Sequence, residues 1–210
     1  MRVDSPPRGE LVGRVVQLVG SCLVLGVGVG LLLLAALGSD GYSTLINGLS
    51  LHFGVPFALV NALVGVLFVA VAWLRGVRPG LGTIVQPVVV GLTVSALLAT
   101  LPAPSQPALR IALLVLAFPV LAAGVAGYLD SALGAGPTEA AALAWDPPVP
   151  FRWSYSALQG VGALVGWSLG AAIGPGTLAV IFLLGALVDL ISRRIRALRR
   201  TQAGLVHDRR

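Results

Sequence analysis

The sequence predicts an all-α, polytopic membrane protein with six transmembrane helices, arranged as two related halves of three helices each. Three observations support this prediction. The 210 residues are 57% hydrophobic and only 10% charged, with a mean hydropathy of +0.94, whereas roughly a quarter of the residues in a soluble domain are charged. Long apolar runs recur along the chain, each near the roughly 20 residues that cross a bilayer. Finally, residue patterns of the first half reappear in the second.

The first apolar run covers residues 11–37, with Arg2 and Arg8 before it and Arg14 in its first turn. Because Ala36-Leu37-Gly38 before Ser39 resembles a signal-peptidase site, a cleaved signal peptide is the alternative interpretation. The apolar core of a signal peptide is only about 7–15 residues long, and this run has a partner later in the chain. We therefore expect a retained transmembrane helix.

Five further apolar runs follow, at residues 56–74, 82–101, 110–133, 154–172 and 177–191. The segment between the third and fourth runs contains three prolines, which cannot sustain a helix because each removes a backbone donor. We accordingly divide the chain into a first repeat at 1–101, a proline-rich linker at 102–109, a second repeat at 110–192 and a basic tail at 193–210.

The arginines predict the orientation of the chain. With the amino terminus in the cytoplasm, all 14 basic residues except Arg110 fall in cytoplasmic segments. Basic residues are enriched on the cytoplasmic side of membrane proteins, and five or seven spans would destroy the asymmetry. We expect a multi-pass protein of the bacterial inner membrane with both termini in the cytoplasm.

Uncommon residues reveal an internal repeat. The matching groups are Val55-Pro56-Phe57 with Val149-Pro150-Phe151, Trp73 with Trp167, and Gly82-Thr83 with Gly176-Thr177. Since each copy has three spans, an odd number, the second copy enters the membrane from the opposite side, and the repeat is inverted. Inverted repeats are typical of secondary transporters, but channels and enzymes also contain them, so fold analogy alone does not establish transport.

A short polar segment follows the first span of each half. Residues 39–54 include Asp40 and Asn47, and residues 135–148 include Thr138 and Glu139. Both segments predict short helices, which either lie flat in the membrane interface or dip into the protein with their amino termini at a central cavity. We favour the second arrangement because glycines at both entrances allow a sharp turn.

Asp130 lies near the end of the fourth apolar run. A carboxylate inside the membrane is a functional candidate because it needs a partner, water or a proton. The alternative is that Asp130 lies within a turn of the interface and reaches headgroup water.

The fifth run is the least apolar. Gly162, Gly166 and Gly170 recur every fourth residue and predict close packing against another helix. Tyr155 and Gln159 are one helical turn apart, and Asn61 is the repeat partner of Tyr155. These polar side chains either hydrogen-bond a substrate or tie helices together.

The basic tail is expected to face anionic lipid or a partner rather than nucleic acid. Its candidate contact residues are Arg193, Arg194, Arg196, Arg199 and Arg200. Cys22 is the only cysteine, and the two histidines lie in unlike places, so we expect neither a disulfide nor a metal site. We expect no cofactor, no set of catalytic groups and no enzymatic activity.

Three further motifs link the chain to a known family. They are Leu37-Gly38-Ser39-Asp40-Gly41-Tyr42, Arg78-Pro79-Gly80-Leu81-Gly82-Thr83 and Gly134-Ala135-Gly136-Pro137. With them, nearly the whole chain resembles the YczE/YyaS/YitT-type bacterial integral membrane proteins, described as permease-like or accessory membrane proteins without a settled substrate. The chain departs from that family at Thr138-Glu139, where Arg-Asp is usual, and at Gln159, where Glu is usual.

Two functions follow from these observations. The first is a small-molecule transporter or exporter, with a pathway lined by Asp40, Asn47, Asn61, Asp130, Thr138, Glu139, Tyr155 and Gln159. The second is an accessory protein that docks a partner or lipid through its basic tail. The expected partners are the lipid bilayer and a small-molecule substrate, not nucleic acid; a homodimer is compatible with the glycine-rich faces, although no residue requires one.

Overall fold

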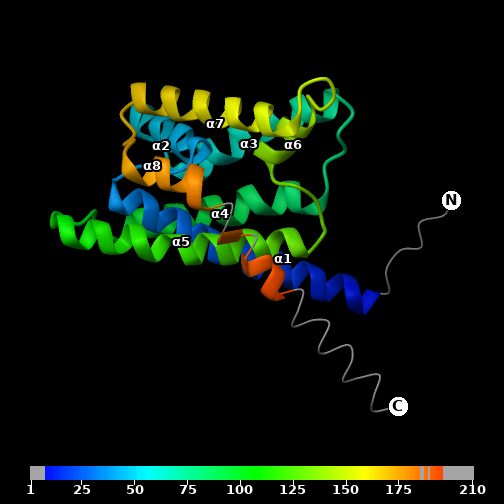
Figure 1. The fold of residues 1–210 in the computed structure, drawn as a ribbon, viewed down its shortest axis with the longest axis horizontal. Coiled ribbons are helices and arrows are strands. Elements are labelled where there is room, and N and C mark those ends of the chain that lie inside the picture. Colours follow the sequence, from blue (N-terminus) through cyan, green and yellow to red (C-terminus); the bar gives the residue numbers. More distant parts are fainter. Residues whose placement is uncertain (1–7, 185–186, 189, 196–210) are drawn as a thin grey trace, which may run out of the picture.

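The computed structural model describes residues 8–184, 187–188 and 190–195, and this part of the chain is helical without strands (Figure 1). The elements in chain order are α1 (Arg8–Ala35), α2 (Gly41–Phe53), α3 (Phe57–Leu74), α4 (Leu81–Thr100), α5 (Pro107–Asp130), α6 (Pro137–Leu143), α7 (Phe151–Ser168), α8 (Pro175–Ala179) and a π-helical turn at Val180–Leu184. Residues 187–188 and 190–195 are also helical.

Four of these helices, α1, α3, α4 and α5, are long and apolar enough to cross a membrane. Their bounds lie within three residues of those expected from the sequence; α1 begins at Arg8 rather than at residue 11, and α5 begins at Pro107 rather than at residue 110. Proline suits the first turn of a helix because its fixed φ is helical and the missing N–H would have no partner there. Helix α7 has 18 residues but is too polar to belong to this set.

Two groups of helices form the structure (Figure 1). Helix α1 packs against α5 and α4 on one side, and α2, α3, α6 and α7 pack together on the other, with α3 also contacting α4. Exposed apolar side chains cover the outside of the spanning helices, for example Val66 on α3 and Val115 on α5. Such a surface matches the hydrocarbon of a bilayer.

Helices α1 and α5 cross at a reciprocal pair of glycine contacts. A Cβ added at Gly28 would lie 2.9 Å from the backbone nitrogen of Leu121, and one added at Gly124 would lie within 2.6 Å of Cα of Leu25. Gly28 and Gly124 occupy equivalent positions when residues 22–39 are aligned with residues 118–135, as do Leu25 and Leu121. The same kind of contact is therefore made twice, with the roles of the two helices exchanged.

The turns after corresponding helices also match. Ala36 follows α1 with φ 51°, and Ala132 follows α5 with φ 54°. This left-handed conformation is uncommon for alanine. Its presence at both Ala36 and Ala132 therefore marks the two turns as the same structural feature. Gly76 after α3 and Gly170 after α7 match in the same way, with φ 90° and 100°.

Backbone hydrogen bonds connect the halves in a matched pair. The N–H of Gly82 donates to the carbonyl of Leu133 at 2.8 Å, and the N–H of Gly176 donates to the carbonyl of Leu37 at 2.9 Å. Each bond joins the first turn of a helix in one half to the turn that precedes α2 or α6 in the other. These bonds hold the two short helices in place.

Candidate functional site

Helix α2 starts with a capped amino terminus. The carboxylate of Asp40, through Oδ2, accepts a hydrogen bond from the N–H of Ser43 at 2.9 Å, and the hydroxyl of Thr44 donates to the carbonyl of Asp40 at 2.8 Å. A side-chain cap of this kind satisfies one of the N–H groups left free at a helix start. The cap places the Asp40 carboxyl at the amino end of α2.

Helix α2 packs along α7 through glycines. A Cβ added at Gly41 would clash with the backbone of Gln159, and one added at Gly48 would clash with the backbone of Gly166. In return, a Cβ at Gly162 would lie 2.7 Å from the carbonyl oxygen of Gly41. The two helices therefore run in the same direction, and α2 begins beside the middle of α7.

Helix α6 has the corresponding position in the other half. It begins with Pro137, which lies beside Gly65 in the middle of α3: a Cβ added at Gly65 would lie 3.7 Å from Cγ of Pro137. Thr138 is buried in this first turn, and Glu139 follows it. Each short helix thus starts beside the middle of a longer helix from the opposite half.

A hydrogen-bonded network connects α2 to α7 and α3. The N–H of Tyr42 donates to Oε1 of Gln159 at 2.9 Å, and Nε2 of Gln159 donates to the hydroxyl of Tyr155 at 2.9 Å. The hydroxyl of Tyr42 reaches the carbonyl of Asn61 at 3.4 Å, and Nδ2 of Asn61 donates to the carbonyl of Pro87 at 2.6 Å. Asn61, Tyr155 and Gln159 therefore lie in one network, where they tie helices together.

Asp40 and Glu139 are both half-buried, at the starts of α2 and α6, which meet neighbouring turns of α3 at Asn61 and Gly65. Both interact with the hydroxyls of Tyr42 and Tyr155. Neither acid belongs to a helix that spans the membrane. Burial is the main cause that raises the pKa of each carboxyl above its ordinary value, and the negative charge of Asp40 raises the pKa of Glu139 further. Each carboxyl therefore favours its protonated form more than a solvated acid would.

Tyr128 on α5 completes this group. It is 1% exposed, and its hydroxyl lies beside the Glu139 carboxyl without the geometry of a hydrogen bond, so it has no hydrogen-bond partner among the described residues. Gln86 on α4 also reaches this place: a Cβ added at Gly136 would lie 2.6 Å from Oε2 of Glu139 and 2.8 Å from Oε1 of Gln86. We call Asp40, Tyr42, Gln86, Tyr128, Glu139, Tyr155 and Gln159 the central polar cluster.

Sequence reasoning did not select Tyr42, Tyr128 or Gln86 as site residues. Tyr128 lies in an apolar run and resembles ordinary core from its neighbours alone. The repeat expected from the sequence offers a sign, because the aligned positions are Leu32 for Tyr128 and Val180 for Gln86. A polar residue in one copy where the other has an apolar residue indicates a role that the fold does not require.

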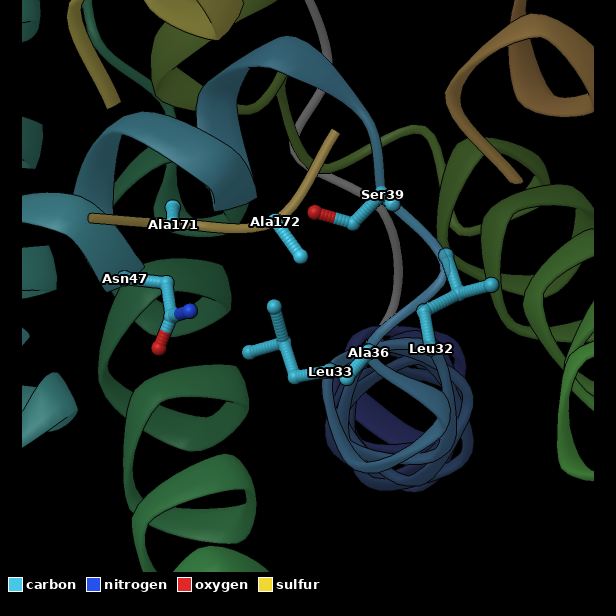
Figure 2. A pocket seen from close by; sticks show the side chains of 8 residues that line it. Leu32, Leu33, Ala36, Ser39, Asn47, Ala171 and Ala172 are labelled. Atoms are coloured by element: carbon cyan, nitrogen blue, oxygen red, sulfur yellow. The ribbon is translucent and has the colours of Figure 1, made fainter. Parts of the chain in front are cut away.

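Two candidate residues lie away from the central polar cluster. Asp130 is at the end of α5, where its Oδ2 accepts a hydrogen bond from Nε2 of Gln17 on α1 at 2.9 Å. Asn47 lines a separate small cavity of about 10 Å³ with Ser39 and with Ala171 and Ala172 from the segment after α7 (Figure 2). This volume is about that of one water molecule.

The remaining candidates are structural or terminal. Gly162 and Gly166 face the backbone of α2, whereas Gly170 forms the turn after α7 and an added Cβ there would meet nothing within 4 Å. Arg193 and Arg194 are exposed. The candidates Arg196, Arg199 and Arg200 lie outside the described residues.

Residues 12–193 match a family described as "Family of unknown function (DUF6198)". An uncharacterized protein of Haemophilus influenzae (strain ATCC 51907 / DSM 11121 / KW20 / Rd) is 26% identical over 168 residues, which cover 79% of this chain and 77% of that protein. No solved structure matches the chain.

Proposed function

The chain belongs to the DUF6198 family of unknown function, and from this premise we propose that it is a small-molecule transporter or exporter of the bacterial cell membrane. The family match does not include a substrate. The proposal therefore depends on the arrangement of the helices and on the chemistry of the central polar cluster. We also propose that the chain is related to the YczE/YyaS/YitT-type proteins.

Six spans in an inverted repeat are the first element of the proposal. Helix α7 and the helical segment from Pro175 supply the fifth and sixth spans next to the four apolar ones. The polar side chains of α7 are compatible with a span because this helix packs against α2 and α6 rather than facing lipid all round. Both termini then lie in the cytoplasm, as the arginine distribution predicts.

The matched contacts between the halves support this repeat. Gly28 and Gly124 exchange roles at the crossing of α1 and α5, and matched hydrogen bonds start from Gly82 and Gly176. Two halves related in this way give two conformations of similar energy, one open to each side of the membrane. Alternating access is therefore the mechanism that we propose.

One observation carries the proposal. The start of α2 reaches α3 through the Tyr42 hydroxyl, which lies 3.4 Å from the carbonyl of Asn61, and Pro137 at the start of α6 lies beside Gly65, one turn further along α3. Both short helices thus direct their amino termini at the same place in the interior. In transporters, discontinuous helices end in this way at a substrate site near the middle of the bilayer.

Flux through proteoliposomes tests the proposal. The full-length protein would be reconstituted, and uptake and efflux of a broad metabolite panel would be compared with vesicles that hold the Asp40→Asn, Glu139→Gln double variant. We expect saturable flux of at least one compound, which the double variant loses. If wild-type vesicles move no compound faster than empty vesicles, the transport proposal is wrong.

The accessory function is the second candidate, and the exposed side chains of Arg193 and Arg194 favour it. Exposed arginines after an apolar helix bind anionic lipid or an acidic partner through charge. A homodimer in the bilayer is compatible with both functions.

A further inference from the structure

We propose that the groove between α7 and α8 binds a small uncharged amphiphile, which enters from the lipid side with its alkyl chain in the groove and its polar head behind it. The inference names a substrate class for the proposed transporter, and it rests on that proposal for the position of α7 and α8 in the bilayer. Binding of the amphiphile can be measured without transport.

The groove has an almost wholly apolar lining. It is open, has a volume of about 300 Å³, and lies between Ala163 and Leu164 in the middle of α7 and the segment 173–178 that begins α8. Leu164, Ile173 and Leu178 on its walls are exposed. Binding sites for small molecules are mostly apolar clefts of roughly 300–1,000 Å³ with a few polar groups. The groove therefore suits the alkyl part of a small molecule that is dissolved in the bilayer.

A small cavity lies directly behind the groove. Residues 171–172 line this cavity of about 10 Å³, and residues 173–174, which follow in the chain, line the groove. Gly38, which also lines the cavity, lies against the groove: a Cβ added at Gly38 would lie 2.7 Å from the backbone nitrogen of Gly174. The short segment that joins α7 to α8 is therefore the wall between the two spaces.

Polar side chains at this wall lack protein partners. The hydroxyl of Thr177 is buried beside Gly38 and makes no hydrogen bond to the described residues. The amide of Asn47 makes none within this part of the chain either, and it lies across the small cavity from the Ser39 hydroxyl (Figure 2). A buried polar group without a partner lowers stability. The polar head of a ligand would supply the missing partner.

The same side chains indicate that the head is uncharged. Ser39, Asn47 and Thr177 donate and accept hydrogen bonds without carrying a charge, and the other described residues that line the groove and the cavity are aliphatic residues and glycines. Burial of a charged head among them would cost far more than burial of a hydroxyl or an amide. Because Asp40 follows Ser39 in the chain, the head would lie next to the central polar cluster.

The aligned helices of the first half are packed together instead. Helix α3 contacts α4 directly, and Nδ2 of Asn61 donates to the carbonyl of Pro87 between them at 2.6 Å. The hydroxyl of Thr83, which is aligned with Thr177, donates to the carbonyl of Ala135 at 2.7 Å. The groove and the unpartnered hydroxyl of the second half are thus features that the shared helix arrangement does not require.

Photolabelling tests the inference. Full-length protein in phospholipid vesicles would be irradiated with a photoreactive diazirine analogue of octanol, and the labelled residues would be located by mass spectrometry. We expect saturable labelling of residues 163–164 and 173–178. Excess octanol should suppress it, and octane should compete about 10-fold less well because it lacks the hydrogen bond of the head. Labelling that spreads over the apolar surface and is not suppressed by octanol overturns the inference.

A variant that fills the groove locates the site. Ala163→Phe places a large side chain in the groove and should abolish the labelling that octanol suppresses. Ala157→Phe is the matched control, because Ala157 is an exposed alanine of α7 that does not line the groove. Suppressible labelling that persists in folded Ala163→Phe protein overturns the inference as well.

The Thr177 hydroxyl gives a test that does not depend on the filled groove. Thr177→Val should weaken octanol binding about 10-fold, the loss of one hydrogen bond. It should not lower the unfolding midpoint of the ligand-free protein, because this hydroxyl has no protein partner to lose. Thr83→Val should lower that midpoint, since the Thr83 hydroxyl is bonded to Ala135. An equal fall for both variants would show that Thr177 is bonded within the protein and would overturn its role in binding the head.

The results separate this inference from transport. Suppressible labelling without flux in proteoliposomes supports the amphiphile site and counts against transport. Flux without suppressible labelling overturns the inference and leaves the transport proposal in place.

Discussion

The backbone N–H of Tyr42 donates a hydrogen bond to Oε1 of Gln159 at 2.9 Å. This bond joins the first turn of α2, in the first half of the chain, to the middle of α7, in the second half. Nε2 of Gln159 donates at the same time to the hydroxyl of Tyr155. One glutamine side chain therefore positions the start of a short helix and a tyrosine of the central polar cluster.

Replacement of this glutamine should destabilise the protein. Gln159→Leu removes the acceptor of the Tyr42 N–H and leaves that donor unsatisfied in the interior, which should cost about 1–3 kcal/mol of unfolding free energy. Thermal or denaturant unfolding in detergent would measure the change. The control is Ser168→Ala on the same helix, since the Ser168 hydroxyl is exposed; equal stability of Gln159→Leu and the wild type would contradict the role of the bond.

The glycine packing between α2 and α7 gives a second prediction. Gly166→Ala should destabilise the protein by about 1–3 kcal/mol, because its Cβ would clash with the backbone of Thr44 and force α2 away from α7. Gly160→Ala on the same helix is the matched control, since nothing lies within 4 Å of its added Cβ. Unfolding midpoints that fall equally for both variants would rule out this contact.

The matched turns give a third prediction. Ala36→Gly and Ala132→Gly should each stabilise the protein by about 1 kcal/mol, because glycine adopts a positive φ without the steric cost that alanine carries. The exposed Ala112 within α5 should respond in the opposite way to the same substitution, with a loss of about 1 kcal/mol. If glycine at Ala36 and Ala132 lowers stability as much as it does at Ala112, the left-handed conformation of these two alanines is contradicted.

The basic tail gives a fourth prediction, which separates the two candidate functions. A chain that ends after Arg194 lacks five of the tail arginines but keeps all of α1 to α8. If the protein is a transporter, flux in proteoliposomes should stay within about twofold of the full-length value, because the truncation removes no residue of the central polar cluster and independent sites have additive effects. Loss of binding to anionic vesicles together with unchanged flux would assign the tail to lipid contact alone.

The membrane class could be predicted from sequence because the hydrocarbon imposes a length and an apolar composition on every spanning helix. The expected run at 56–74 is α3 (Phe57–Leu74), and the run at 82–101 is α4 (Leu81–Thr100). Helix α7 was harder to assign, since a helix that packs against other helices needs less apolar surface. That α7 crosses the membrane remains a prediction.

The central polar cluster could be predicted only in part. Asp40 and Glu139 stood out because each follows the turn into a short polar helix. Asp130 was an equally strong candidate in sequence, but its partner Gln17 comes from the start of α1, a contact across the chain that no local pattern reveals. Tyr128 was missed for the same reason, since its burial beside Glu139 depends on how α5 meets α6.

Access to the two short helices is the most direct test of the central claim that both end at one site. Single cysteines would replace Asp40, Ser43, Thr138 or Glu139 in a Cys22→Ala background, and a membrane-impermeant thiol reagent would be applied from each side. The account predicts that positions from both helices react through one aqueous cavity, from a side that changes with the conditions. Fixed labelling of Asp40→Cys and Ser43→Cys from outside only, and of Thr138→Cys and Glu139→Cys from inside only, would contradict it and favour the accessory function.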